Sequence, residues 1–370
     1  MPRVRWPTAA LLLPALVLLL LAGLALSSPP ALGGPTPGKA CKPVGRTVVV
    51  GEWTYTCVKK KKGKSPVWVR TPTPAPTPTP TPTPEPPANN EEVASLAFAR
   101  TTGAERPGDP TSTGTGPWAT TLQLSEGATL GALGTPVDVI DQAGVPSLLA
   151  LPDGRLLAYF VSWAQGNVMG VGILDAGTWR FYRIAVSGFT ISPGGANGVD
   201  PSAVTLPDGS IRLFWMQPTG PRGTSQIHSA TSAPGSALGV RFAIDAGTRL
   251  DPGTMVFDPT VALCAGQWYL WVNESGVTTF ATSTDGLSFT EQSAPAGLDG
   301  VFPWSATCLP DGNVQLLASK DTASGLPYSG DMSGFRANGS SLLPSGALAD
   351  ASLARLPDSS WTLAYLTRMP

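Results

Sequence analysis

The sequence is short of the residues on which most metal and redox chemistry depends. Its 370 residues include one histidine, His228, and four cysteines that are not clustered as zinc ligands are. It also lacks a phosphate-binding glycine loop, a nucleotide fingerprint and a recognisable Ser-His-Asp set. We therefore expect no metal site and no cofactor, and we interpret His228 as a structural residue of a strand.

Charge is scarce as well, and it is unevenly distributed. Charged residues make up 13% of the chain, and the formal net charge is −1. Residues 41–70 alone carry eight basic residues against one glutamate, so the remainder of the chain is acidic. An acidic large domain argues against nucleic acid as its partner.

Helical periodicity is the third feature that the sequence lacks. Beyond the N-terminus no stretch repeats apolar residues at helical spacing over three turns, whereas glycine (42) and proline (39) are plentiful. This composition is typical of many short strands joined by tight turns. We therefore predict an all-β protein.

The N-terminal segment 1–28 has the features of a secretory signal peptide. Arg3 and Arg5 precede the apolar run 9–26, and small residues follow at the end of that run. Because the run is long, an uncleaved membrane tether through residues 9–26 remains the alternative. Either outcome places the remainder outside the cytoplasm, secreted or held at the cell surface.

Two further segments precede the large domain. Residues 41–70 predict a small basic β module, in which Cys41 and Cys57 form a disulfide because so small a core needs a covalent link. This module resembles a short cysteine-stapled unit of bacterial secreted and wall-associated proteins. Its run Lys59–Lys62 would contact anionic wall polymers or lipid headgroups, or would only be a solvated charge run. Residues 71–90 alternate Thr and Pro and predict an extended linker.

One phrase recurs through residues 91–370. Its clearest copy is VDPSAVTLPDG at residues 199–209, followed by an apolar run, and this pattern predicts a hairpin. Aligned on the Asp of the phrase, the copies start at residues 145, 200, 258, 303 and 350. Five paired-strand units with a period of about fifty residues predict a five-bladed β-propeller. Since the fifth unit lacks outer strands, residues 93–99 and 118–124 are predicted to complete it and to close the ring.

The phrases resemble those of sialidase- and arabinanase-type propellers, which are secreted proteins and glycosidases. Residues 283–289 (STDGLSF) are similar to the Asp-box turn of sialidases, with Phe289 at the end where sialidases have Trp. We expect Asp285 to bind backbone donors of a turn far from the axis. The resemblance also implies a sugar-binding pocket where the innermost strands begin.

The first residue of each repeat would border that pocket. These residues are Val145, Asp200, Asp258, Pro303 and Asp350. Glycoside hydrolysis needs two carboxyl groups at the scissile bond. In the five-bladed glycosidases resembled here, the first blade supplies an Asp base and the fourth a Glu acid. Because this chain has valine and proline at those places, the standard catalytic pair is absent.

Aromatic side chains are the other component of a sugar site. Trp304, one residue into the fourth repeat, and Trp163, at the end of a second strand, are expected at the mouth of the pocket. The predicted ligand-binding residues are Asp200, Asp258, Asp350, Trp304 and Trp163. A structural role for the three aspartates, as acceptors for backbone N–H groups, remains open beside this one.

These residues lead to a hypothesis of non-catalytic recognition of carbohydrate or a cell-wall polymer. The alternative is a divergent glycoside hydrolase with Glu274 as acid and Asp258 or Asp200 as base. A third alternative is a protein-binding scaffold. Cys264 and Cys308 lie at similar places in neighbouring repeats and form either a disulfide or two buried thiols.

Overall fold

The structure is a computed structural model that divides into two units, Met1–Thr83 and Pro84–Pro370. It describes residues 36–42, 44–50, 53–59, 65–72, 93–103, 120–191, 196–219, 223–235, 238–274, 276–321, 323–348 and 350–369. The predicted signal segment 1–28, Lys60–Lys62 of the lysine run and most of the Thr-Pro linker lie outside these residues. Across the ranges that are described, no helix is both long enough and apolar enough to cross a membrane.

The first unit contains a small antiparallel sheet. Its order is β1 (Thr47–Val50), β2 (Trp53–Val58) and β3 (Val67–Pro72). The disulfide between Cys41 and Cys57 is formed, and both residues are buried. The predicted disulfide is therefore confirmed, and it ties the segment before β1 to the central strand.

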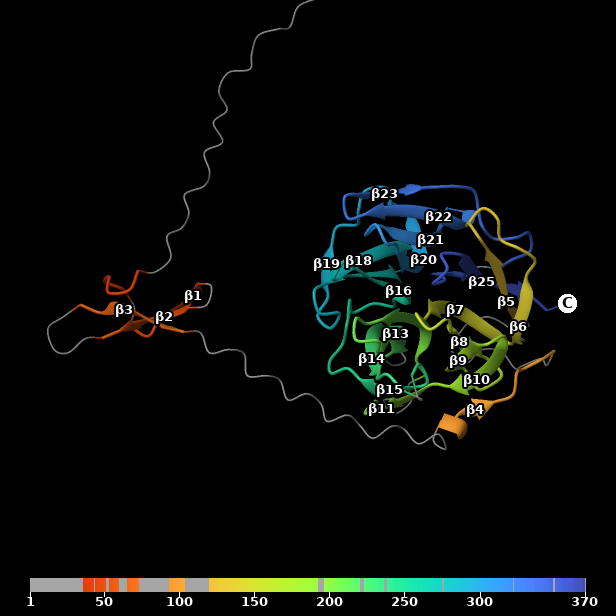
Figure 1. Ribbon diagram of the computed structural model, residues 1–370, viewed down its shortest axis with the longest axis horizontal. Helices are drawn as coiled ribbons and strands as arrows, with labels where there is room; N and C mark the ends of the chain where they lie inside the picture. The colour runs from red at the N-terminus through yellow and green to blue at the C-terminus, as the bar shows by residue number, and fades with distance from the viewer. Residues whose placement is uncertain are drawn as a thin grey trace, which may run out of the picture. The chain divides into compact units, whose positions relative to one another are not determined.

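The second unit is a five-bladed β-propeller, in which five sheets surround one axis (Figure 1). The innermost strands of successive blades contact one another around the ring, including the last with the first. From the axis outward, blade 1 contains β7 (Ala143–Ala150), β8 (Leu156–Ser162), β9 (Val168–Asp175), β10 (Thr178–Arg183) and β4 (Ala97–Phe98). Blade 2 contains β12 (Val199–Thr205), β13 (Ile211–Pro218), β14 (Ser225–Ser232), β15 (Arg241–Ile244) and β11 (Ala185–Ser187).

The other three blades have four strands each. Blade 3 contains β16 (Phe257–Cys264), β17 (Gln267–Glu274), β18 (Val277–Ser283) and β19 (Thr290–Gln292). Blade 4 contains β20 (Val301–Cys308), β21 (Val314–Lys320), β22 (Ala323–Asp331) and β23 (Gly334–Ala337). Blade 5 contains β24 (Ser352–Arg355), β25 (Trp361–Arg368), β5 (Thr120–Gly127) and β6 (Val137–Asp141).

Blade 5 combines strands from both ends of the domain. The last strand, β25, pairs along its full length with β5, which in turn pairs with β6. The prediction for residues 93–99 was wrong, because the strand within them, β4, pairs with β10 at the outer edge of blade 1. The place expected for that segment is taken by β6, which leads directly into blade 1.

A ring of hydroxyl side chains joins the innermost strands. The third residue of each repeat phrase is Ser or Thr, and in four blades its Oγ accepts a hydrogen bond from a backbone N–H of the next blade. These bonds are Ala203 N to Ser147 (3.2 Å), Val261 N to Ser202 (3.1 Å), Leu353 N to Ser305 (2.9 Å) and Leu148 N to Ser352 (2.9 Å). Between blades 3 and 4 the Thr260 hydroxyl instead donates to the carbonyl of Pro303, at 3.0 Å.

The contact between blades 3 and 4 also contains a disulfide. Cys264 at the end of β16 and Cys308 at the end of β20 form a disulfide, with their Cα atoms 5.3 Å apart. Of the two alternatives for these cysteines, the structure shows the disulfide. Elsewhere the blades are held together by apolar clusters between neighbouring sheets, such as the one that joins Phe214 of blade 2 to Trp268 of blade 3.

Candidate functional site

A break in the ladder positions the first residues of each repeat. Near the start of each of the innermost strands β7, β12, β16 and β20, the register with the second strand shifts. Such a β-bulge bends the strand and redirects a side chain. In blade 5 the strand itself begins only at Ser352, two residues after Asp350.

The backbone at these positions has a left-handed conformation. The φ angles are 50° at Val145, 57° at Asp200, 51° at Asp258 and 66° at Asp350. Asp tolerates this region, whereas a β-branched residue in it is strained. Proline cannot adopt a positive φ, which explains why blade 4, with Pro303, differs from the others.

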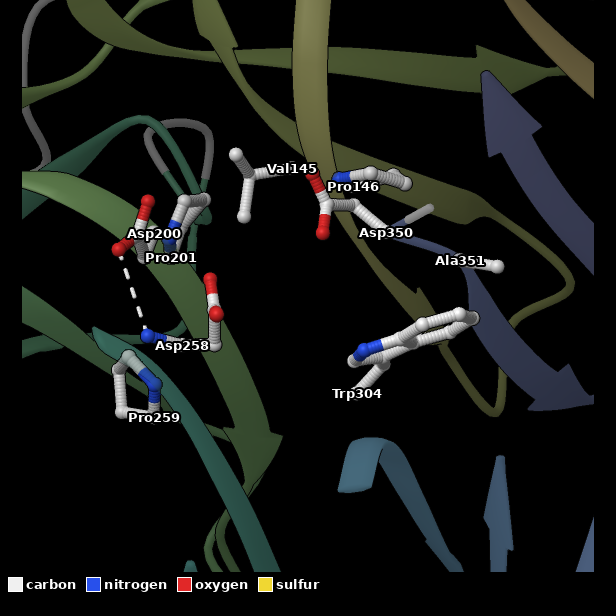
Figure 2. Close-up of a pocket in the computed structure, with 9 residues that line it drawn as sticks. All are labelled: Val145, Pro146, Asp200, Pro201, Asp258, Pro259, Trp304, Asp350 and Ala351. Atoms are coloured by element: carbon white, nitrogen blue, oxygen red, sulfur yellow. Dashed lines mark hydrogen bonds between the residues drawn. The ribbon is translucent and has the colours of Figure 1, made fainter. Parts of the chain in front are cut away.

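The bulges bring the repeat starts together around one pocket at the axis. Figure 2 shows the pocket, with the side chains of Asp258 and Asp350 directed into it and the indole of Trp304 beside them. Its enclosed volume is about 20 Å³. We call it the acidic pocket; its lining residues are Val145, Pro146, Asp200, Pro201, Asp258, Pro259, Trp304, Asp350 and Ala351.

The three carboxyl groups affect one another's ionisation. Burial raises the pKa of Asp258 well above its usual value, and the charges of Asp200 and Asp350 raise it further. Burial also raises the pKa of Asp350, to about 6. Asp200 Oδ2 accepts a hydrogen bond of 3.3 Å from the backbone N–H of Asp258, so this carboxylate also braces the neighbouring blade. Asp258 and Asp350 therefore keep their protons to higher pH than ordinary carboxyl groups do, and a protonated carboxyl donates a hydrogen bond as well as accepting one.

The indole of Trp304 supplies the apolar part of the acidic pocket. The residue occupies the position at which blades 1 to 3 have proline, and it packs against the core of blade 5. In Figure 2 its ring lies across the pocket from Asp200 and Pro201. A flat apolar surface thus lies opposite acidic oxygen atoms.

Two of the predicted site residues do not line the acidic pocket. Trp163 is buried, its Nε1 donates to Thr120 Oγ1 at 3.1 Å, and its ring occupies the space beside Gly144 where a Cβ would clash. Glu274 lies at the end of β17, where its two oxygen atoms accept hydrogen bonds from Thr254 (2.6 Å) and Thr279 (3.0 Å).

Four residues that border the acidic pocket were not predicted from the sequence. Pro146, Pro201, Pro259 and Ala351 each follow the first residue of a repeat. The repeated Pro was visible in the alignment of the phrases. It predicted that each strand starts rigidly, but not that these residues line a pocket. The direction of a side chain at a bulge does not follow from the alternation along a strand.

The Asp-box turn has the structural role expected of it. Asp285 Oδ1 accepts hydrogen bonds from the N–H groups of Leu287 (2.7 Å) and Ser288 (2.8 Å), which lower its pKa to about 2. Arg212 of blade 2 donates to the carbonyl of Asp285 at 2.9 Å and lies over the ring of Trp268. The turn therefore links blades 2 and 3 at a distance from the acidic pocket.

His228 is also placed in a structural setting. Its ring stacks on Trp215 at 5.9 Å, and burial lowers its pKa. Throughout the described part of the chain, no three His, Cys, Asp or Glu residues are grouped so that they could hold a metal ion. The chemistry that the acidic pocket offers is hydrogen bonding and proton exchange by carboxyl groups, next to an aromatic surface.

Comparison with known proteins gives likenesses of structure only. No family model matches the sequence, and no curated protein matches it. Among solved structures, the chain is similar to an α-L-arabinofuranosidase of Fusarium graminearum bound to an iminosugar inhibitor, with 12% identity, a TM-score of 0.45, and 74% of this chain and 98% of that chain covered.

Two further likenesses have similar values. The endo-arabinase of Bacteroides thetaiotaomicron is 13% identical, with a TM-score of 0.43 and 62% of this chain and 94% of that chain covered. A protein of unknown function from Dyadobacter fermentans is 15% identical, with a TM-score of 0.44 and 64% and 80% covered. What the structure itself establishes is a five-bladed β-propeller with an acidic, tryptophan-bearing pocket on its axis.

Proposed function

We propose that the propeller recognises carbohydrate through the acidic pocket and does not hydrolyse it. The observation that supports this most directly is the set of side chains at the five repeat starts. Three of them are aspartates whose carboxyl groups meet at one pocket beside Trp304, and the other two positions are Val145 and Pro303.

Sugar hydroxyls both donate and accept hydrogen bonds, and the aspartates offer both functions. An ionised carboxylate accepts from a hydroxyl, while a protonated carboxyl donates to one. The pKa of Asp350, about 6, provides a protonated group below that pH, and the pKa of Asp258 is raised as well. The face of Trp304 would cover the apolar C–H face of a pyranose or furanose ring.

The size of the acidic pocket limits what it holds. Its enclosed volume is about 20 Å³, and a single water-sized group needs roughly 10–15 Å³ by the same measure. We therefore propose that one hydroxyl group of a terminal sugar unit enters it, with the sugar ring at its mouth and the rest of a glycan outside.

Hydrolysis is the second candidate, and one observation favours it. Glycosidases rely on a pair of carboxyl groups of which one is protonated. Here the Asp200 carboxylate accepts a hydrogen bond from the backbone N–H of Asp258, and the charge of Asp200 contributes to the raised pKa of Asp258. Against this, Glu274 lies outside the lining of the acidic pocket and is bonded to two threonines. We therefore place recognition first.

Glycan-array binding by the full chain tests the proposal. We expect binding that Asp258→Asn and Trp304→Ala each weaken at least tenfold and that Trp304→Phe partly retains. Asp299→Asn changes an exposed carboxylate outside the pocket and serves as the matched control. Loss of binding in the control as well, or no binding to any glycan, would overturn the proposal.

A hydrolysis assay separates the two candidates. With a panel of nitrophenyl glycosides we expect no turnover above background. Turnover that Asp258→Asn abolishes would establish the hydrolase instead. If Glu274→Gln, tested as a separate variant, also lost turnover, Glu274 would be assigned as the acid.

The two disulfides bear on the compartment in which the protein acts. Both disulfides fit an oxidising compartment. We propose that the propeller acts outside the cytoplasm, with the basic module and the Thr-Pro segment holding it near a surface.

A further inference from the structure

The carboxyl groups of Asp258 and Asp350 have no partner among the described residues. No hydrogen-bond donor contributes to the ionisation of either group, and the ion pairs in that part of the chain lie elsewhere. Burial is the largest cause of the raised pKa at each. Figure 2 shows both side chains directed into the acidic pocket. Buried acceptors that the chain itself leaves unsatisfied are available to a donor from outside.

The lining of the acidic pocket carries charge of one sign. Its nine residues include Asp200, Asp258 and Asp350 and contain no lysine, arginine or histidine. The whole domain has the same bias, since residues 91–370 include 23 acidic residues and 13 basic ones. A cation is therefore attracted to this pocket over a distance and gains electrostatic free energy inside it.

The enclosed space of about 20 Å³ suits one ammonium group. An ammonium group is about as large as a water molecule or a hydroxyl group, and one such group needs roughly 10–15 Å³. It differs from a hydroxyl in its positive charge and in its three N–H donors, which can serve acceptors on different sides of the pocket. Hydrogen bonds between an ammonium and a carboxylate are about twice as strong as those between neutral groups.

The indole of Trp304 adds a second attraction for a cation. The residue is half-buried, and in Figure 2 its ring lies beside the carboxyl groups of Asp258 and Asp350. A cation near the face of a tryptophan is attracted by the ring, and the attraction grows when the cation is removed from water. A neutral hydroxyl group has no comparable interaction.

We propose that the acidic pocket prefers an amino sugar, whose ammonium group enters it in place of a hydroxyl group. This proposal rests on the carbohydrate recognition proposed above and narrows its class of ligand. Asp258 and Asp350 would accept hydrogen bonds from the ammonium group, and the sugar ring would lie at the mouth of the pocket beside Trp304. The negative charge of Asp200 would add to the attraction.

Calorimetric titration of the full chain at pH 7 tests the preference. The probes are glucosamine and galactosamine, each compared with its neutral parent, glucose or galactose. We expect at least one amino sugar to bind at least tenfold more tightly than its parent, and N-acetylglucosamine to bind no better than glucose because its nitrogen is uncharged. Parent sugars that bind as tightly as both amino sugars would overturn this proposal and leave carbohydrate recognition standing. If no sugar bound at all, both would fail.

A peptide could also supply an ammonium group, through a lysine side chain. Nα-acetyl-lysine amide is the probe for this source. We expect it to bind at least tenfold more weakly than the better amino sugar, because its flexible chain has no ring to cover Trp304 and loses more conformational entropy. Equal or tighter binding of the lysine derivative would assign the pocket to a peptide and overturn the proposal.

Substitution of one carboxyl group is the last arm. We expect Asp350→Asn to lower the ratio of amino-sugar to neutral-sugar affinity at least threefold, because the side chain keeps its shape and loses its charge. Asp299→Asn, at an exposed carboxylate outside the pocket, is the matched control and should leave the ratio unchanged. An unchanged ratio in Asp350→Asn would contradict the assignment.

The affinity for the amino sugar should also depend on pH. Asp200, Asp258 and Asp350 are the ionisable residues of the lining, and each binds a cation better when it is ionised. We expect the affinity to rise from pH 5 to pH 7 and to rise less in Asp350→Asn. An affinity that falls over this range would overturn the proposal.

Discussion

At the scale of single residues, the most unusual position is Val145. It occupies the left-handed region with φ of 50°, although it is β-branched, at a place where three other blades have aspartate. Strained backbone of this kind persists only where the surrounding structure imposes it, and it is concentrated at functional sites. The bulge in β7 imposes the conformation here, because the flanking register is fixed by pairing with β8.

Relief of that strain should be measurable. We expect Val145→Asn to raise the free energy of unfolding by about 1 kcal/mol, because Asn adopts positive φ readily and Val does not. Val145→Gly should show a smaller gain, since glycine also increases the entropy of the unfolded chain. Denaturant melts measure both changes, and a loss of stability in both variants would refute the strain argument.

Asp350 leads to a prediction about pH. Its pKa in the folded protein, about 6, exceeds the ordinary 3.8, so the folded state binds the proton more tightly than the unfolded state. The free energy of unfolding should therefore fall as pH rises from about 4 to about 6 and stay low above that. In Asp350→Asn we expect this fall to be smaller by about 3 kcal/mol. Urea melts between pH 4 and pH 8 measure it, and an identical pH dependence in the variant would contradict the assignment.

At the scale of strands, the sequence predicted the innermost pairs well and the outermost strands poorly. The phrase that ends in Leu-Pro-Asp-Gly combines turn chemistry with two apolar runs, and both signals are local. Short outer strands such as β4 and β6 have two and five residues, and their own sequences do not specify a partner. Tertiary packing decides between them, which is why residues 93–99 were placed on the wrong blade.

In the acidic pocket, too, residues placed by the repeat were predicted and residues placed by tertiary packing were not. The repeat alignment brought Asp200, Asp258, Asp350 and Trp304 to one end of the axis because it needed only the register of the repeats. The expectation for Trp163 and Glu274 needed the direction of side chains at the ends of second strands. That direction is set by the local pleat and by partners such as Thr120 and Thr254, which the sequence does not reveal.

The ring of hydroxyl side chains between the innermost strands should contribute to stability. Ser352 is buried, and its Oγ is the acceptor for Leu148 N at the contact between blades 5 and 1. We expect Ser352→Ala to lower the free energy of unfolding by about 1–3 kcal/mol, because a buried N–H loses its acceptor. Ser293→Ala, at an exposed serine, is the control and should change stability by less than about 0.5 kcal/mol. Hydrogen exchange at the Leu148 amide should rise only in the first variant; exchange that stays slow there would argue against the bond.

At the scale of the whole molecule, the ring is closed in two ways. Strand pairing of β25 with β5 joins the ends of the domain, and the Cys264–Cys308 disulfide joins blades 3 and 4. The disulfide lies at the one contact where Thr260 donates to a carbonyl instead of accepting an N–H. The covalent bond thus reinforces the contact at which the hydroxyl ring is different.

Removal of this disulfide should weaken the propeller as a whole. We expect Cys264→Ser combined with Cys308→Ser to lower the free energy of unfolding by about 3 kcal/mol, because the unfolded chain regains the freedom of a loop between residues 44 apart. Cys41→Ser with Cys57→Ser is the comparison, since that disulfide belongs to the other unit. Thermal melts of the propeller transition should shift only for the first pair, and an equal shift for both pairs would contradict this account.

The left-handed starts of the repeats have a consequence for the design of new binders. Because the peptide backbone at residues 145, 258 and 350 is already held in a shape that Asn, Asp and Gly accept, these three side chains could be exchanged in one combinatorial library. Asp200 would be kept, since its carboxylate binds the backbone N–H of Asp258 in the next blade. Pro303 fixes the remaining corner, so such a library would vary the polar groups around an unchanged indole. Selectivity for new small molecules could then be selected at the acidic pocket without any loop being rebuilt.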